Sequence, residues 1–424
     1  MKETSTHDFW KSPEGLKIKF RKIRAGKSRA AVSTPLRTKK SNKKADQAFI
    51  RERLLRQLSP WKIYWARKGI KLPRKRAGIA LDFKFLSFAR TTPRVDKICK
   101  WIIDELHGQG EESLLFYDDR QVKLLFALLI KVENRSDDSD LIYLTGQTFT
   151  NSISTIKMAA SLDVPWNPID FASQRSLGIY EFQFEGDYDG WRDYPRGIRP
   201  VGEELIRGKF ANKLRLQYEC LKQVDMSVSR LLVDFSTGYT KRVSNWDREN
   251  WLAWMMKSPY VFNFGPLPEM KGERTLFVSD IKNLVESRVE DNPHLYPIFL
   301  DLGVTLIYFE SKKGKDLDNI FNEILPNILE IIRPIGSDVT HWSNIEEIVD
   351  VQSESNLKKN RGGNFSINFI EAISLPSPNT ELYLPGTVIV CLARGDRDTS
   401  WWESAGDFLE EQYRKDFAND SIVD

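Results

Sequence analysis

The feature that most constrains the fold of this chain is a succession of strands and helices that recurs. In the first half, alternating or helically spaced apolar residues predict a strand over 15–23, a helix over 45–68, a strand over 79–85, a helix from 94 to 106, and strands over 122–132 and 141–149. From Tyr260 onward the pattern returns. A strand and turn over 261–270 come first, followed by a helix over 275–289, a strand over 304–308 and a helix over 313–332. A hairpin of 345–353 with 364–373 and a last strand over 388–395 complete it. We therefore expect an α+β protein that contains a tandem duplication.

The length of 424 residues fits two or three domains, and an apolar content of 41% is enough to build their cores. The repeat suggests five segments along the chain. They are a basic N-terminal strand and arm (1–44), a first domain (45–160), a connecting region with helices (161–255), a second domain (256–395) and an acidic, helix-like tail (396–424).

The charge of the chain is unevenly distributed. Residues 1–80 hold 24 Lys or Arg and 5 Asp or Glu, whereas the rest of the chain holds 39 basic and 54 acidic residues. A local net charge of +19 suits an electrostatic arm that binds a polyanion such as nucleic acid. A solvated basic tail that only aids solubility has the same composition, so charge alone leaves both interpretations open.

Several function classes have no support in the sequence. No apolar run approaches the length of a membrane-spanning helix, and the first ten residues lack the apolar core of a secretory signal. Three scattered cysteines form neither a disulfide framework nor a metal motif, so a reducing, cytoplasmic setting is expected. A phosphate-binding loop of the GxxxxGK[ST] type is absent from the sequence, and no nucleotide cofactor is expected.

Candidate chemistry in the first half lies between residues 94 and 122. Asp96 opens a helix whose Lys100 is on the same face, and Asp118 and Asp119 form a turn that enters the strand at Val122. Carboxylates gathered at a helix start and a strand edge can hold a hard divalent cation such as Mg²⁺. A helix cap at Asp96 and an ordinary turn at Asp118 and Asp119 are the corresponding structural roles.

The second half has a related acidic stretch between a strand and a helix. Asp316, Asp318 and Asn319 lie there, within the sequence KDLDN, at the position that Arg94 and Asp96 occupy in the first half. Capping of the helix and compensation of its dipole would also explain Asp316.

These motifs resemble the RusA-type Holliday-junction resolvases, whose marks are a DLDN-like sequence opening a helix, a lysine one turn later, and a DD-x-QV turn entering a strand. The similarity covers roughly residues 75–135 and 260–372, and a basic turn at 359–363 (KNRGG) is also similar. It implies two RusA-like strand-helix-strand-helix-hairpin domains that form a pseudo-dimer within one chain. It further implies an endonuclease that depends on Mg²⁺ or Mn²⁺ and cuts four-way or other branched DNA.

The resemblance implies functional residues in both halves, and neither half has the full set. Asp96, Lys100, Asp118 and Asp119 are the catalytic candidates of the first half, where Arg94 replaces the first aspartate of the DxD pair. Those of the second half are Asp316, Asp318 and Asn319, but Asn322 replaces the lysine, and residues 341–347 (HWSNIEE) have no aspartate pair. The implied metal ligands are Asp96, Asp119, Asp316 and Asp318, with Glu346 or Glu347 as substitutes in the second half.

The proposed contacts to DNA are basic residues of the arm and of the second-half turn. They are Lys17, Lys19, Arg21, Lys39, Lys40, Lys43, Lys44, Lys358, Lys359 and Arg361. In the hydrolysis of a phosphodiester, a cation positions water and relieves phosphate charge, and the ammonium of Lys100 would contact the phosphate or the leaving group. The alternatives are a DNA-binding protein with the same tandem fold but decayed sites, and a protein-interaction scaffold.

Overall fold

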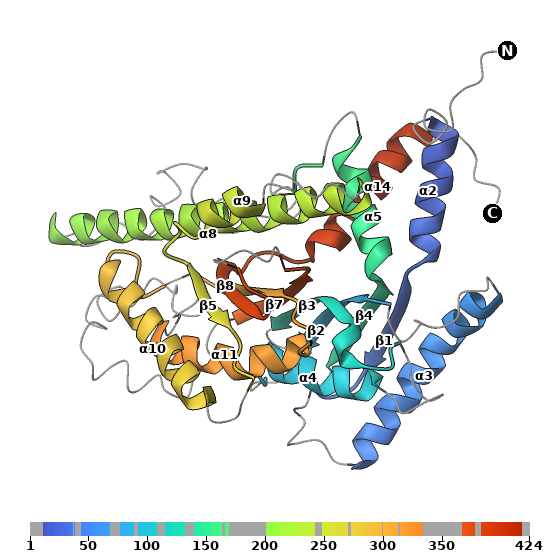
Figure 1. Cartoon of the computed structure of the whole chain (residues 1–424), viewed down its shortest axis with the longest axis horizontal. Helices are drawn as coiled ribbons and strands as arrows, with labels where there is room; N and C mark the ends of the chain where they lie inside the picture. Colours follow the sequence, from blue (N-terminus) through green and yellow to red (C-terminus); the bar gives the residue numbers. More distant parts are fainter. Residues whose placement is uncertain are drawn as a thin grey trace.

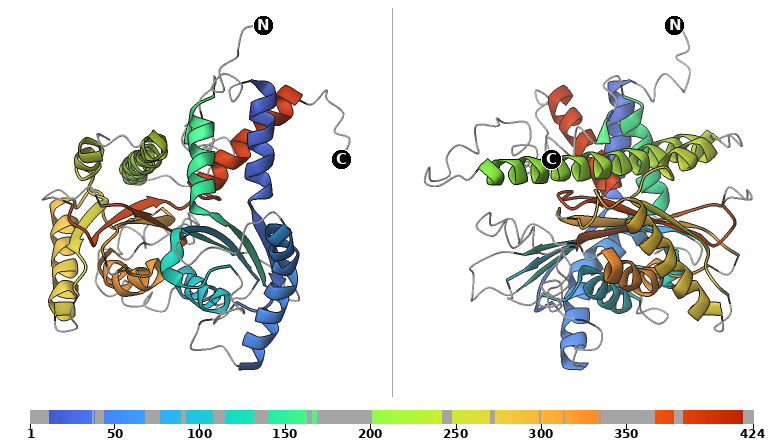
Figure 2. Two further views of the ribbon diagram at one scale, coloured as in Figure 1. Left: turned by 45° about the vertical axis from the view of Figure 1, so that its right-hand side comes forward. Right: turned by 90° about the vertical axis from the view of Figure 1, so that its left-hand side faces the viewer.

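The structure is a computed structural model, and its layers are shown in Figure 1 and, from two further sides, in Figure 2. It describes residues 12–36, 38, 44–67, 77–88, 92–107, 115–131, 140–162, 166–168, 201–241, 248–269, 273–298, 300–312, 314–332, 334, 367–377 and 383–417.

Eight strands form one mixed sheet in the order β1-β4-β2-β3-β7-β6-β8-β5. The strands are β1 (Ser28–Ser33), β2 (Ile79–Ser87), β3 (Val122–Lys131), β4 (Leu141–Thr148), β5 (Val261–Pro266), β6 (Leu302–Phe309), β7 (Ile367–Leu375) and β8 (Thr387–Arg394). The fold class is therefore α+β, as the sequence predicted.

The pairing pattern is the same when the sheet is read from either edge. Strands β2 and β3 are parallel, as are β6 and β7, and every other neighbouring pair is antiparallel. One irregularity also corresponds, because the register shifts between Ile79 and Ala80 in β2 and between Leu302 and Gly303 in β6. The two halves meet where β3 pairs with β7.

Helices cover both faces of this sheet. The helices of the first half are α2 (Pro13–Ala25), α3 (Lys44–Arg67), α4 (Val95–Leu106) and α5 (Phe149–Ala160), and those that follow are α8 (Val201–Lys241), α9 (Arg248–Met255), α10 (Arg274–Asp291), α11 (Leu317–Ile332) and α14 (Trp401–Phe417). In Figures 1 and 2, α5, α8 and α14 lie on one side of the sheet and α4 and α11 on the other. Helices α4 and α11 pack against each other across the junction of the halves.

A buried arginine ties α14 to the central strands. The Arg397 guanidinium pairs with Glu371 of β7 at 2.7 Å, and both side chains are at most 1% exposed. It also stacks on the rings of Phe126, Phe369 and Trp401, with distances of 4.3 to 5.4 Å to the ring centroids. Aromatic faces and a carboxylate together compensate for the desolvation of this buried charge.

The sequence prediction is wrong at residues 15–23, which belong to helix α2 and not to a strand. Ser12 caps the helix by accepting a hydrogen bond from the Gly15 amide. Phe20 and Ile23 are buried and Ile18 is 38% exposed, so the helical spacing, not the alternation, decides which side chains enter the core. An apolar pattern this short fits both periods.

The arm expected within residues 1–44 is also partly wrong, since residues 28–33 form the edge strand β1, which pairs with β4 and buries alternate residues. Helix α5 (Phe149–Ala160), which was not predicted, begins directly after β4 with Thr148 as its cap. The helix predicted over 45–68 is confirmed as α3, which continues through Pro60. The strand expected over 345–353, and with it the hairpin turn, lies outside the described residues.

Candidate metal centre at the junction of the two halves

The aspartate pair of the first half occupies a rigid turn before β3. Asp118 caps a short 3₁₀ turn, Asp119–Gln121, by accepting a hydrogen bond from the Arg120 amide at 2.9 Å. The buried Gln121 fixes the turn from within, because its side-chain oxygen accepts from the amides of Tyr117 and Asp118 while its NH₂ group donates to the Ala77 carbonyl. The DDRQV motif thus encodes the local conformation.

The aspartate of the second half comes from the start of α11. Asp316 directly precedes Leu317, the first residue of the helix, and its backbone carbonyl accepts from the Ile320 amide at 3.1 Å. The Asn319 side chain donates to Asp316 Oδ2 at 2.7 Å and so orients the carboxylate. Gly314, with a φ of +60°, makes the turn that leads into this position.

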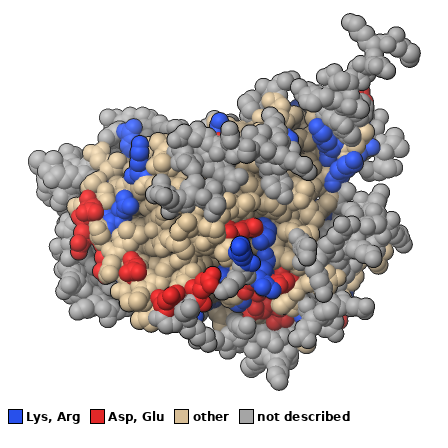
Figure 3. All heavy atoms as spheres, viewed as in Figure 1, with Lys and Arg blue, Asp and Glu red and all other residues tan. Residues whose placement is uncertain are grey.

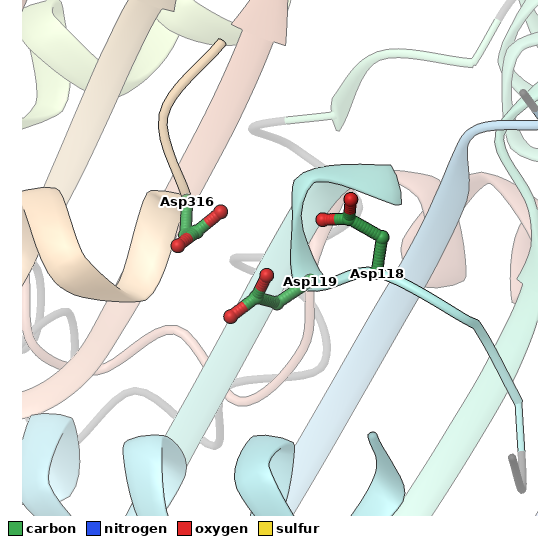
Figure 4. Close-up of side chains that lie close together, drawn as sticks. All are labelled: Asp118, Asp119 and Asp316. Carbon is green, nitrogen blue, oxygen red and sulfur yellow. The ribbon is translucent and has the colours of Figure 1, made fainter. Parts of the chain in front are cut away.

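These two elements bring three carboxylates together, as Figure 4 shows. Asp118, Asp119 and Asp316 each offer an oxygen, and the three oxygens lie within 4.8 Å of one another. All three side chains are half-buried. The group combines both halves of the chain, because Asp118 and Asp119 precede β3 and Asp316 precedes α11.

The charges of this group are unequally compensated. Burial and the neighbouring charge of Asp316 raise the pKa of Asp119 to about 6. In contrast, the Arg120 guanidinium bonds both oxygens of Asp118 and lowers its pKa to about 2. Asp119 and Asp316 therefore form a carboxylate pair whose mutual repulsion a bound hard cation would relieve.

Lys100 of α4 reaches across the junction to the second half. Its ammonium lies 2.6 Å from Asp318 Oδ2 and 3.2 Å from Asp104 Oδ1. Burial alone would lower the pKa of Lys100, but the attraction of Asp318 and Asp104 outweighs burial and raises it. A charged ammonium is therefore held between Asp318 and Asp104, and its field also reaches Asp119.

Asp96, expected as a metal ligand beside Asp119, lies outside the three-carboxylate group. Arg94 donates to both of its oxygens, at 2.9 and 2.7 Å, and Lys97 lies 3.6 Å away. The Asp96 side chain is 1% exposed. The structure therefore gives Asp96 a guanidinium partner at the start of α4, whereas it brings Asp316 to the site.

A cavity of about 660 Å³ opens over the three carboxylates. Its wall includes the side chains of His107, Arg120, Arg274 and Lys315. In Figure 3, basic and acidic side chains lie next to each other in the lower centre of the face shown. The residues that line the cavity include both bases and acids, which allows a phosphate to approach a cation held by carboxylates.

The basic residues expected to bind DNA are only partly described. Lys17, Lys19 and Arg21 belong to helix α2, where Lys17 and Arg21 lie four residues apart on one side and Arg21 is exposed. Lys39, Lys40, Lys43, Lys358, Lys359 and Arg361 lie outside the described residues, as do Glu346 and Glu347, and the side chain of Lys44 is also not described.

Sequence reasoning identified all three carboxylates but grouped them by half. The missing signal was that each half has the motif residues that the other half lacks. The first half has Lys100 and the aspartate pair but no first DxD aspartate, and the second half has Asp316 and Asp318 but neither the lysine nor the aspartate pair. It also missed Arg120 as the partner of Asp118.

No protein-family model, curated protein or solved structure matches the chain. Among the described helices, none is long and apolar enough to cross a membrane.

Proposed function

We propose that this protein is an endonuclease that requires a divalent cation and cuts branched DNA at one site shared by its two halves. The observation that carries the proposal is the meeting of Asp118 and Asp119 with Asp316 in one cavity. The sheet order, in which each half repeats the other's pairing, supports the related proposal that the chain is a RusA-like pseudo-dimer.

The residues at the junction add up to one complete set of the resolvase motif. The second half contributes Asp316, Asp318 and Asn319, and the first half contributes Lys100 and the turn with its two aspartates. Neither half has this set alone. Complementary retention across the junction is what selection for a single site would leave behind.

The chemistry of the donors fits Mg²⁺ or Mn²⁺, since carboxylate oxygens are the ligands that such hard cations prefer. Asp119 and Asp316 would hold the cation, and Asp118 would join them once Arg120 releases it. A bound cation would relieve phosphate charge and make a water molecule a better nucleophile.

The side chains of the chain itself have distinct tasks in hydrolysis. The water oxygen bonds to phosphorus and the bond from phosphorus to one ester oxygen breaks. The proton that the attacking water loses balances the proton that the leaving oxygen gains as it departs as a hydroxyl. Lys100 stabilises the negative charge that develops, because its raised pKa keeps it protonated. Arg120, once free of Asp118, is placed to bind a phosphate oxygen at the cavity wall.

The second candidate is a non-enzymatic DNA-binding protein with the same tandem fold. The observation that favours it is the neutralisation of acidic residues by neighbouring cations, as in the pairs Arg94 with Asp96 and Lys100 with Asp318. In that case the junction would have only a structural role, and DNA binding would depend on salt but not on the three carboxylates.

Cleavage of a labelled four-way junction, a fork and a plain duplex in Mg²⁺ or Mn²⁺ distinguishes the two candidates. Asp119→Asn and Asp316→Asn should each abolish cleavage, although they lie in different halves, and should leave junction binding intact. Asp234→Asn, which removes one partner of the exposed i,i+4 pair with Arg230 on α8, is the matched control and should cut normally. Absence of cleavage by the wild type on every substrate, with binding unchanged in all variants, would establish the second candidate.

A test of whether the basic N-terminus binds DNA should change its charges without removing the elements α2 and β1. Removing residues 1–44 would also remove α2 and the edge strand β1, so a loss of binding would have two explanations. Replacing Lys17 and Arg21 by glutamine keeps α2 and tests whether its charges contribute to DNA affinity, as a shallower dependence on salt would indicate.

A further inference from the structure

The starts of helices α4 and α11 occupy corresponding positions in the two halves but carry opposite charges. Arg94 precedes the first residue of α4 as Asp316 precedes that of α11, and Asp96 corresponds to Asp318. A guanidinium thus stands in one half where the other half has the carboxylate that enters the candidate metal centre.

At the start of α4, the arginine takes up the acceptors that a cation would need. Both oxygens of Asp96 receive hydrogen bonds from Arg94, and Lys97 adds a second positive charge 3.6 Å away. The pair is buried on the side of Asp96, whose side chain is 1% exposed. A divalent cation would have to displace a buried, bidentate ion pair and approach two positive side chains.

The lysine that crosses the junction also lacks a counterpart. Lys100 of α4 pairs with Asp318 of α11, but the corresponding residue of α11 is the uncharged Asn322. Asn322 accepts a hydrogen bond from Lys97 and donates to the Asp318 carbonyl at 2.8 Å. It therefore supplies no ammonium that could stabilise a leaving group at the start of α4.

We infer that each chain has a single hydrolytic site and cuts one strand per binding event, so that a symmetric branched substrate is nicked and not resolved by paired incisions. This inference rests on the proposed function. The sheet offers two corresponding places for chemistry. Within the described part of the chain, the place at Asp316 gathers three carboxylates within the field of Lys100, whereas the start of α4 has the cations Arg94 and Lys97 against Asp96. The latter place has been converted into an ion pair that stabilises the junction.

A supercoiled plasmid with an extruded cruciform measures the number of incisions directly. The protein is bound to the plasmid without metal, and Mn²⁺ is then added together with excess competitor DNA so that each complex acts once. The expected first product is the nicked circle, with no linear DNA. Linear plasmid as the first product would overturn the inference and leave the proposed nuclease function in place. No cleavage of this plasmid, of other junctions or of duplex DNA would overturn both.

Binding of Mn²⁺ without DNA gives a second measurement that does not depend on activity. Free Mn²⁺, followed by its electron paramagnetic resonance signal, should be taken up by the wild type and by the double variant Arg94→Gln/Asp96→Asn with the same stoichiometry. Asp316→Asn should lose this uptake. A lower stoichiometry in the double variant would show that the start of α4 also holds a cation and would overturn the inference.

Discussion

Replacing Asp119 by asparagine should stabilise the metal-free protein while it removes cation binding. The reason is that burial and the charge of Asp316 raise the pKa of Asp119 from 3.8 to about 6. The ionised carboxylate is thus less stable in the folded chain than in the unfolded one. Asparagine has nearly the same shape and carries no charge.

The magnitude of the effect follows from the rise in the pKa of Asp119. At a pH above the folded and unfolded pKa values, this rise corresponds to at most about 3 kcal/mol of unfavourable free energy in the folded state. Solvent screening at this half-buried position reduces that to about 1–2 kcal/mol. For a chain of this size we expect the unfolding temperature of Asp119→Asn to rise by about 1–3 °C at pH 8.

The sign of the pH dependence is fixed by the same reasoning. Between about pH 4 and pH 6 the unfolded chain has released the proton of Asp119 while the folded chain retains it, so the wild type loses stability as the pH rises. The advantage of the variant should therefore be small at pH 4, grow up to about pH 7 and then stay constant. Cation binding to the wild type should strengthen over the same interval, because the bound form needs the carboxylate ionised.

Addition of Mg²⁺ should reverse the order of stability. A ligand at about one hundred times its dissociation constant stabilises the wild type by about 2.7 kcal/mol, whereas Asp119→Asn gains nothing. The assay is thermal unfolding followed by circular dichroism at several pH values, with and without the cation, and with Asp234→Asn as the control. A variant that is less stable than the wild type without metal at pH 8, or whose gain is equal at pH 4 and pH 8, would refute the reasoning.

Two further substitutions test how the structure is held together around the site. Arg94→Gln leaves the buried Asp96 without its guanidinium and should lower the free energy of unfolding in urea by about 2–4 kcal/mol. Adding Asp96→Asn should recover most of that loss, and equal losses in the single and double variants would contradict the ion-pair argument. In Gly303→Ala, the new methyl group would lie 2.0 Å from the Phe369 ring, so the free energy of unfolding should fall by about 3 kcal/mol. Adding Phe369→Leu should restore most of it, and an unchanged stability of the single variant would contradict this packing.

Local patterns in the sequence predicted most of the elements on which the site stands. The apolar spacing of α4 specifies a helix with a buried side, and the apolar run after the aspartate turn specifies the strand β3, whose residues are buried along most of its length. The pattern was ambiguous at α2, where apolar residues two and four apart fit a strand as well as a helix. It was uninformative at β1, whose partner β4 lies more than a hundred residues later.

The candidate residues were also recognisable in the sequence, but their grouping was not. Chain order places Asp96 beside Lys100 and the aspartate turn, and the structure instead brings Asp316 to that turn and Lys100 to Asp318. Nothing local distinguishes these two arrangements, since both need only a helix start and a strand edge.

The sequence by itself determined the α+β class and predicted where the acidic candidate residues lie in each half. Only the tertiary structure decided that Asp118 and Asp119 of the first half lie together with Asp316 of the second. The physical reason is the antiparallel pairing of β3 with β7, which joins the halves in one sheet and packs α4 against α11. That contact is made between residues more than two hundred positions apart, so it depends on the packing of the whole sheet and not on any local pattern.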